Sequence, residues 1–395
     1  MDKYIILIIL SSLVIFSYLF DMIARKTRFP SVLFLLLTGL VIRFLTDYFR
    51  LPTFNFLMIL PTLGTMGLIL IVLEGALELK YERRKLQLIL NSFFSSLIIL
   101  VATSVSIAYV FTLLTGFSFT ACFINALPFS IISSAIAIPS SKGLKARQRE
   151  FVVYESAFSD IIGVIIFNFI LYNQEIHVSS FFALTLETLL IIVISLLFCL
   201  FLLYIIRKIR HPVKFFLIIA IIVLVYSAGH LLHLPSLLMV LVFGLFFNNA
   251  EEIRPLSFKK YFLYDDYRLD LSQFYKLSAE SAFLIRTFFF IIFGFIIDIK
   301  AFDQWTLIDY TIVVLLIIYF VRFAYLKFIG REKLLPLLFL NPRGLISILL
   351  FFSLPEDMAI PNIDSKLLFL VVLSTSLIMS IGLITNGRPK AGEDR

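Results

Sequence analysis

Residues 118–139 read SFTACFINALPFSIISSAIAIP, and residues 334–355 read LLPLLFLNPRGLISILLFFSLP. Both stretches are long and apolar enough to cross a membrane as helices, yet both contain internal prolines and polar residues. Proline removes a backbone donor and clashes with the preceding turn, so both helices are expected to be interrupted. An ordinary kink is the alternative. An interruption inside a membrane frees backbone carbonyls that can coordinate a cation where water reaches them.

The rest of the chain has the composition of an integral membrane protein. Of its 395 residues, 61% are hydrophobic and only 15% are charged, and the mean hydropathy is +1.02. These values lie outside the range of soluble globular proteins. The net charge of +8 would suggest a nucleic-acid partner in a soluble protein. Here the basic residues lie between apolar segments, so they indicate membrane topology and no nucleic-acid partner is expected.

The apolar runs predict an all-α integral membrane protein of about thirteen transmembrane helices, because only helices can satisfy their backbone within lipid. The expected helices cover residues 4–20, 30–46, 54–78, 87–114, 118–139, 150–172, 179–206, 213–229, 234–248, 279–298, 306–326, 334–355 and 366–385. Helices 5 and 12 are the two that should be discontinuous.

The interruptions lie seven spans apart, and this odd offset gives the second copy the opposite orientation, as an inverted-topology repeat requires. The predicted organisation is a first repeat (1–172, helices 1–6), a linking helix 7 (179–206), a second repeat (213–385, helices 8–13) with a cytoplasmic loop (249–278), and a short cytoplasmic tail (386–395). Paired broken helices in corresponding positions point to a binding site near the membrane midplane.

Lysine and arginine divide unequally between the two predicted faces. One face carries 26 of them and the other carries five. The excess marks the cytoplasmic face, so we expect the amino terminus outside and the carboxyl terminus in the cytoplasm of a bacterial-type inner membrane. Three arginines remain inside apolar spans: Arg286, Arg322 and Arg343. Each needs a partner, because a buried arginine costs about 2.5–3.5 kcal/mol on insertion scales.

A carboxylate lies deep in the sixth expected helix. The segment 154–160 reads YESAFSD, and a nearly unbroken apolar stretch follows Asp160. Ser156 and Asp160 share one helix face, while Glu155 and Ser159 share another about 100° away. A carboxylate inside a span is a functional candidate, with a structural ion pair as the alternative. Glu74 is also flanked by apolar residues and is a second candidate.

Cysteine and histidine do not point to an enzyme or a metal centre. Cys122 and Cys199 lie in apolar runs without metal-ligand neighbours, so core packing is expected rather than a disulfide. His230 and His233 stand three residues apart beside a predicted external turn, but no carboxylate lies nearby in the sequence. Interfacial packing is favoured over metal binding there. We therefore expect no enzymatic activity and no cofactor.

At its acidic and broken segments the sequence resembles the monovalent cation–proton antiporter superfamily, nearer its sodium/proton exchanger branch. Residues 73–77 (LEGAL) are similar to the family's Phe-Glu-Gly-Gly-Leu segment, and residues 155–160 (ESAFSD) to its Glu-Ser-Leu-Leu-Asn-Asp. Residues 289–294 (FFIIFG) resemble its Phe-Phe-x-x-x-Gly, and residues 342–345 (PRGL) its Arg-Gly segment. The order and spacing of these segments make the resemblance specific across the whole chain.

The resemblance implies a homodimeric antiporter that serves pH homeostasis by exchanging Na+, or alternatively Li+ or K+, for H+ by alternating access. Asp160 would be the shared ion- and proton-binding carboxylate. Oxygens from Ser156, Glu74 and the unwound backbone near Ser133 and Ser134 would complete the site. A potassium efflux system or a passive cation channel is the alternative function.

The resemblance also implies a structural ion pair between Glu155 and Arg343. Two positions depart from the family pattern. Ser159, which we include among the ion-binding residues, replaces the usual asparagine, and Ala135 stands where an aspartate is expected. The site then lacks paired aspartates, which favours electroneutral exchange. Arg286 stands where many exchangers carry a glutamate; as a modulating residue it would pair with a site carboxylate or reach the cytoplasmic interface, and the interface is favoured.

Overall fold

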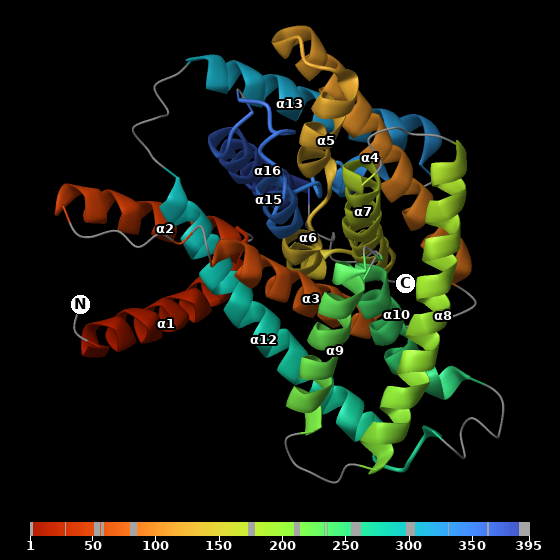
Figure 1. Cartoon of the computed structure of the whole chain (residues 1–395). Coiled ribbons are helices and arrows are strands. Elements are labelled where there is room, and N and C mark those ends of the chain that lie inside the picture. The colour runs from red at the N-terminus through yellow and green to blue at the C-terminus, as the bar shows by residue number, and fades with distance from the viewer. Residues whose placement is uncertain are drawn as a thin grey trace. The chain divides into compact units, whose positions relative to one another are not determined.

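The computed structural model describes residues 3–27, 29–50, 56, 59–79, 85–172, 178–208, 214–232, 234, 236–253, 262–297, 305–330, 332–361 and 363–386. In these ranges the chain forms helices and loops without a β-strand (Figure 1). The first elements are α1 (Lys3–Thr27), α2 (Ser31–Tyr48), α3 (Leu60–Glu78), α4 (Leu86–Thr115), α5 (Phe119–Ser130), α6 (Ser134–Ser140), η3 (Ser141–Gly143), α7 (Ala146–Tyr172) and α8 (Val178–Lys208). The later elements are α9 (Lys214–Leu231), α10 (Ser236–Asn249), η4 (Ala250–Glu252), α12 (Tyr267–Ile296), α13 (Trp305–Ala324), η6 (Tyr325–Ile329), α14 (Leu334–Leu337), α15 (Leu345–Phe352) and α16 (Ser365–Asn386).

The all-α membrane architecture expected from the sequence is confirmed. Every expected helix range overlaps a helix or an interrupted pair of helices. Within the described ranges, nine helices are long and apolar enough to cross a membrane, and shorter apolar helices accompany them. The count of thirteen spans and the division into two inverted repeats remain predictions.

The largest departure from the expected boundaries lies in α12. This helix begins at Tyr267, twelve residues before the predicted start at 279, so the interval 249–278 is not a loop throughout. Charged residues lower the hydropathy of this first part: Arg268, Asp270 and Lys276. A hydropathy pattern therefore locates only the apolar part of the helix.

Both predicted interruptions are present. Between α5 and α6 the chain is extended, with φ and ψ of −79° and 129° at Ile131 and −76° and 115° at Ser133. Figure 1 shows this extended stretch joining the two half-helices. Pro128 lies inside α5, so the chain leaves the helix shortly after the proline rather than at it. The second interruption covers residues 338–344, between α14 and α15.

The two interruptions contact each other directly. The Ser133 backbone N–H donates a hydrogen bond to the Pro342 carbonyl, with an N–O distance of 2.8 Å. A β-carbon placed on Gly344 would lie 2.3 Å from the Ser133 Oγ. Only glycine permits so close an approach. The two interruptions therefore form a crossing, the contact of Ser133 with Pro342 and Gly344, that depends on the glycine.

The chain forms two compact units, and both interruptions belong to the first. This unit comprises Met1–Thr65, Leu90–Gly163 and Leu284–Arg395. Within it, α2 and the end of α12 lie in backbone contact. A β-carbon on Gly39 would meet the Ile291 carbonyl oxygen at 2.0 Å, and one on Gly294 would meet the Leu36 carbonyl oxygen at 2.3 Å.

The second unit comprises Met66–Ile89 and Val164–Phe283. In it α8 packs against α10, and Gly244 packs so closely on Ala76 that a β-carbon would lie 2.4 Å from the alanine Cβ. The carboxylate of Asp270 accepts hydrogen bonds from Lys214 Nζ, at 2.5 Å, and from the Tyr264 hydroxyl. Burial, and then the hydrogen bond to Asp270, raise the pKa of Tyr264, so the phenol stays protonated as a donor.

Candidate ion-binding site

Asp160 lies in α7, beside the interruption between α5 and α6. The residue is buried, with only 1% of its surface exposed. The Oδ2 atom accepts a hydrogen bond from the Ser134 backbone N–H at 3.3 Å, at the first residue of α6. In the described structure Oδ1 has no hydrogen-bond partner, and no basic side chain lies within 4.0 Å of the carboxylate. One buried carboxylate oxygen is thus available for a proton or a cation.

Two serines on α7 flank this carboxylate. Ser159 Oγ accepts a hydrogen bond from the Ile132 backbone N–H at 2.9 Å, so it holds the extended stretch against α7. Ser156 lies one turn before Asp160 and donates to the Val152 carbonyl at 2.7 Å. Both serines are fully buried, and their oxygen lone pairs remain potential ligands.

The structure brings together four of the six expected ligands at the interruption: Asp160, Ser133, Ser134 and Ser159. Ser156 lies one helical turn away on the expected face of α7. Glu74 lies on α3 in the second unit, half-buried. Its contribution to the Asp160 site therefore remains a prediction.

Glu155 does not pair with Arg343, as the resemblance implied, but with Arg322 on α13. Arg322 Nη2 lies 2.9 Å from Glu155 Oε2, and Nη1 lies 3.2 Å from Oε1. Ser95 on α4 donates a third hydrogen bond to Oε1 at 2.6 Å. Arg322 also donates from Nε to the Leu337 carbonyl at 2.8 Å, at the end of α14. A bidentate pair in which both partners make further hydrogen bonds is the favourable geometry for a buried ion pair.

Arg343 instead binds neutral oxygens around the crossing. Its Nε donates to the Phe129 carbonyl at 2.5 Å, and its Nη1 donates to the Asn341 side-chain oxygen at 2.7 Å. Its backbone N–H donates to Thr375 Oγ1 at 3.1 Å. Phe129 belongs to the last turn of α5, whose carbonyls lack helical partners and carry the negative end of the helix dipole. The carboxyl-terminal end of α5 therefore stabilises the Arg343 guanidinium in place of a carboxylate.

Arg286 reaches the first turn of α6. Its Nη1 donates to the Ala135 carbonyl at 3.2 Å, and its side chain is partly buried. Of the two alternatives, pairing with a site carboxylate is not seen in the described structure, where the observed partner is a backbone oxygen. The favoured alternative, contact with the cytoplasmic interface, remains a prediction.

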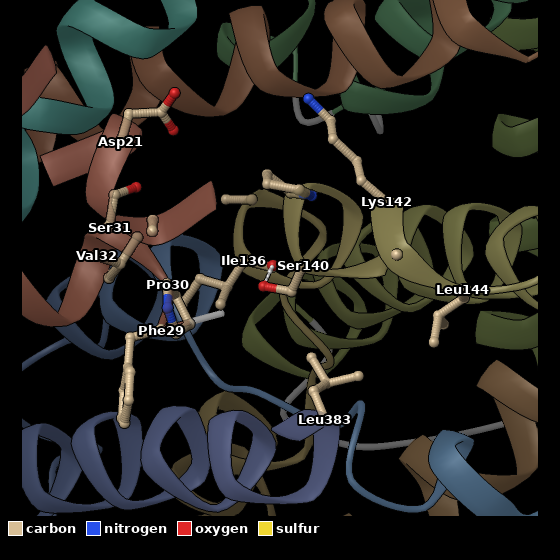
Figure 2. Close-up of a pocket in the computed structure, with 14 residues that line it drawn as sticks. Asp21, Phe29, Pro30, Ser31, Val32, Ile136, Ser140, Lys142, Leu144 and Leu383 are labelled. Atoms are coloured by element: carbon tan, nitrogen blue, oxygen red, sulfur yellow. Dashed lines mark hydrogen bonds between the residues drawn. The ribbon is translucent and has the colours of Figure 1, made fainter. Parts of the chain in front are cut away.

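A cavity of about 420 Å3 lies beside this first turn of α6. Ala135 and Ile136 of α6 line it, together with Asp21 of α1 and Lys142 of η3. Figure 2 shows the Asp21 carboxylate and the Lys142 amine extending into the cavity from opposite sides. At about 30 Å3 for each water molecule, this space is large enough for a hydrated monovalent cation.

Sequence reasoning missed several residues that hold the site in place. Ser95, Asn341 and Thr375 are ordinary polar residues within apolar helices, and no spacing marked their contacts. Arg322 could have been recognised as part of a buried ion pair, since an arginine within a span requires a partner.

The potential cation ligands around Asp160 are oxygen atoms, the ligand type that hard cations prefer. Among the described residues no group of three or more His, Cys, Asp or Glu is placed to hold a metal ion.

Two interrupted helices that cross beside a buried carboxylate define the class of ion-coupled secondary transporters. The chain belongs to the family described as sodium/hydrogen exchanger, transmembrane, which matches residues 9–385. It is therefore a multi-pass membrane protein of a transporter family. No curated protein sequence matches it.

Solved structures share the fold. The sodium proton antiporter MjNhaP1 from Methanocaldococcus jannaschii at pH 8 aligns with a TM-score of 0.75 and 18% identity, over 96% of this chain and 100% of that one. A structure of the same antiporter from an electron-microscopy map aligns with a TM-score of 0.71 and 19% identity, over 99% and 100% of the two chains. At these identities the likeness shows the fold.

Proposed function

We propose that this protein exchanges Na+ for H+ across the membrane by alternating access, with Asp160 as the shared binding site. The supporting observation is the buried Asp160 carboxylate beside the junction of α5 and α6, whose Oδ1 is, among the described residues, the one buried carboxylate oxygen without a hydrogen-bond partner. Membership of the exchanger family and the fold likeness to a sodium proton antiporter support the same proposal. Li+ and K+ are the other cations that this oxygen set could take.

Competition for one carboxylate converts binding into exchange. A proton and a partly dehydrated cation neutralise the same charge, so one leaves when the other binds. An unneutralised carboxylate is costly to carry across the membrane interior, and the loaded or protonated forms are the ones that change access. Ser156, Ser159, Ser133 and the backbone at Ser134 supply further oxygens, and Glu74 is proposed as an additional ligand.

The stoichiometry follows from the number of carboxylates. Ser159 stands next to Asp160 and gives its oxygen to the Ile132 N–H, so it adds no charge to the site. We propose that Asp160 alone takes up and releases the proton and that Glu74 only lends an oxygen to the cation, which gives one proton for each monovalent cation and electroneutral exchange. We further propose a homodimer in a bacterial-type inner membrane, with the amino terminus outside and the carboxyl terminus in the cytoplasm.

Proton flux in reconstituted vesicles tests this function. Addition of Na+, Li+ or K+ in turn to vesicles with a trapped pH-sensitive dye should drive proton movement, and the rate should not change when the membrane potential is clamped. Asp160→Asn keeps the size of the side chain and should abolish the flux. Asp309→Asn removes an exposed carboxylate on α13 and should leave it unchanged. Cation movement without proton movement would indicate a channel, and normal exchange by Asp160→Asn would disprove the site.

A further inference from the structure

Arg286 is a positively charged residue within an apolar span. In the described structure its hydrogen-bond partner is a backbone carbonyl and not a carboxylate. Its guanidinium donates to the Ala135 carbonyl at 3.2 Å. In the described part of the chain no carboxylate oxygen lies within 4.0 Å of it. Its positive charge therefore acts on its surroundings rather than being neutralised in an ion pair.

This charge is held next to the Asp160 site. Ser134 and Ala135 are consecutive residues, with Cα atoms 3.8 Å apart as in any trans peptide. The Ser134 N–H binds the Asp160 carboxylate, and the Ala135 carbonyl binds Arg286. Two hydrogen bonds through adjacent residues thus hold a fixed positive charge near the negative one. Both charges are at least partly buried, so salt screens their interaction weakly.

Ala135 also lines the 420 Å3 cavity, to which Asp21 and Lys142 contribute side chains (Figure 2). The guanidinium is therefore bound at a turn of α6 that borders the cavity through Ala135 and holds the Asp160 carboxylate through Ser134. The positive charge of Arg286 opposes the approach of a cation to this turn.

We propose that Arg286 is an affinity-setting residue that weakens cation binding at Asp160 by electrostatic repulsion and so speeds cation release. This inference rests on the proposed exchange function of Asp160. Arg286 does not act as a ligand: it is tied to a backbone oxygen and repels the bound ion through space. At an effective dielectric constant of about 20, a unit charge held by the residue next to the one that binds Asp160 weakens cation affinity on the order of tenfold.

Arg286→Gln removes the charge while keeping a donor for the Ala135 carbonyl. In vesicles at alkaline pH, where protons compete least, it should lower the KM for Na+ about tenfold without raising the maximal rate. Arg286→Lys retains the charge and should keep the KM within about twofold of the native value. Arg268→Gln is the matched control, because Arg268 lies on the same helix in an exposed pair with Glu251 and should leave the KM unchanged.

A second variant covers the case in which Arg286→Gln does not fold. Arg286→Met removes the charge and keeps a long side chain, so it should also lower the KM. An unchanged or higher KM in whichever of Arg286→Gln and Arg286→Met folds would overturn the inference, as would equal KM values for Arg286→Gln and Arg286→Lys. In each case the loss of exchange in Asp160→Asn would still support the proposed function. A failure of the inference about Arg286 is therefore distinguishable from a failure of the proposed function of Asp160.

Discussion

Removal of Arg322 should strongly destabilise the protein, because Glu155 would be left as a buried charge. Both residues are essentially inaccessible, at 0% and 1% exposure, and two N–O contacts of 2.9 and 3.2 Å join them. Loss of one partner from such a pair costs about 3–5 kcal/mol. We therefore expect Arg322→Met to lower the free energy of unfolding by about this amount.

A double-mutant cycle separates this ion pair from the rejected one. Glu155→Gln and Arg322→Met, made singly and together, should show a coupling of about 2–3 kcal/mol when unfolding is followed in mixed detergent micelles. The matched cycle replaces Arg322→Met with Arg343→Met, which removes an equally buried arginine that does not bond to Glu155. Its coupling should be clearly smaller. The assignment is refuted if Glu155 couples more strongly to Arg343, or if Glu155 and Arg322 are additive within about 0.5 kcal/mol.

Two further substitutions test the contacts around the interruptions. Gly344→Ala should place a methyl group 2.3 Å from the Ser133 Oγ, force the interrupted stretches apart and cost about 1–3 kcal/mol of stability together with most of the exchange rate. Gly143→Ala, where no heavy atom lies within 4 Å, is the control, and equal unfolding midpoints and rates for the two variants would contradict the proposed close contact. Asn125→Leu should cost about 1–3 kcal/mol in the same unfolding measurement, because the Met358 carbonyl loses its donor from Nδ2; a native midpoint would show that this bond does not stabilise the fold.

The interruptions were predictable because their cause is local. Proline lacks a donor wherever it stands, so Pro128 and Pro342 indicate broken helices before any tertiary contact is known. The exact break was less predictable, since α5 continues through Pro128 to Ser130. The depth of Asp160 was also predictable from its apolar neighbours, and its burial is confirmed.

The partner of Glu155 could not be predicted from the residues alone. Arg322 and Arg343 both lie in apolar spans, and both need compensation. Helical periodicity assigns Glu155 to a face of α7, but it does not specify which neighbouring helix faces it. The family pattern favoured Arg343 as the partner. In the structure Arg343 donates to a carbonyl at the end of α5, and the Glu155 carboxylate pairs with Arg322.

Two successive backbone N–H groups at the crossing donate hydrogen bonds to different partners. Ser133 bonds to Pro342 in the second interrupted helix, and the next residue, Ser134, bonds to Asp160. If Asp160 binds the cation as proposed, a shift of its carboxylate would act on the Ser134 backbone, one residue from the hydrogen bond to the second interrupted helix. Main chain alone would then connect ion binding to the contact between the two interruptions, without a relay of side chains.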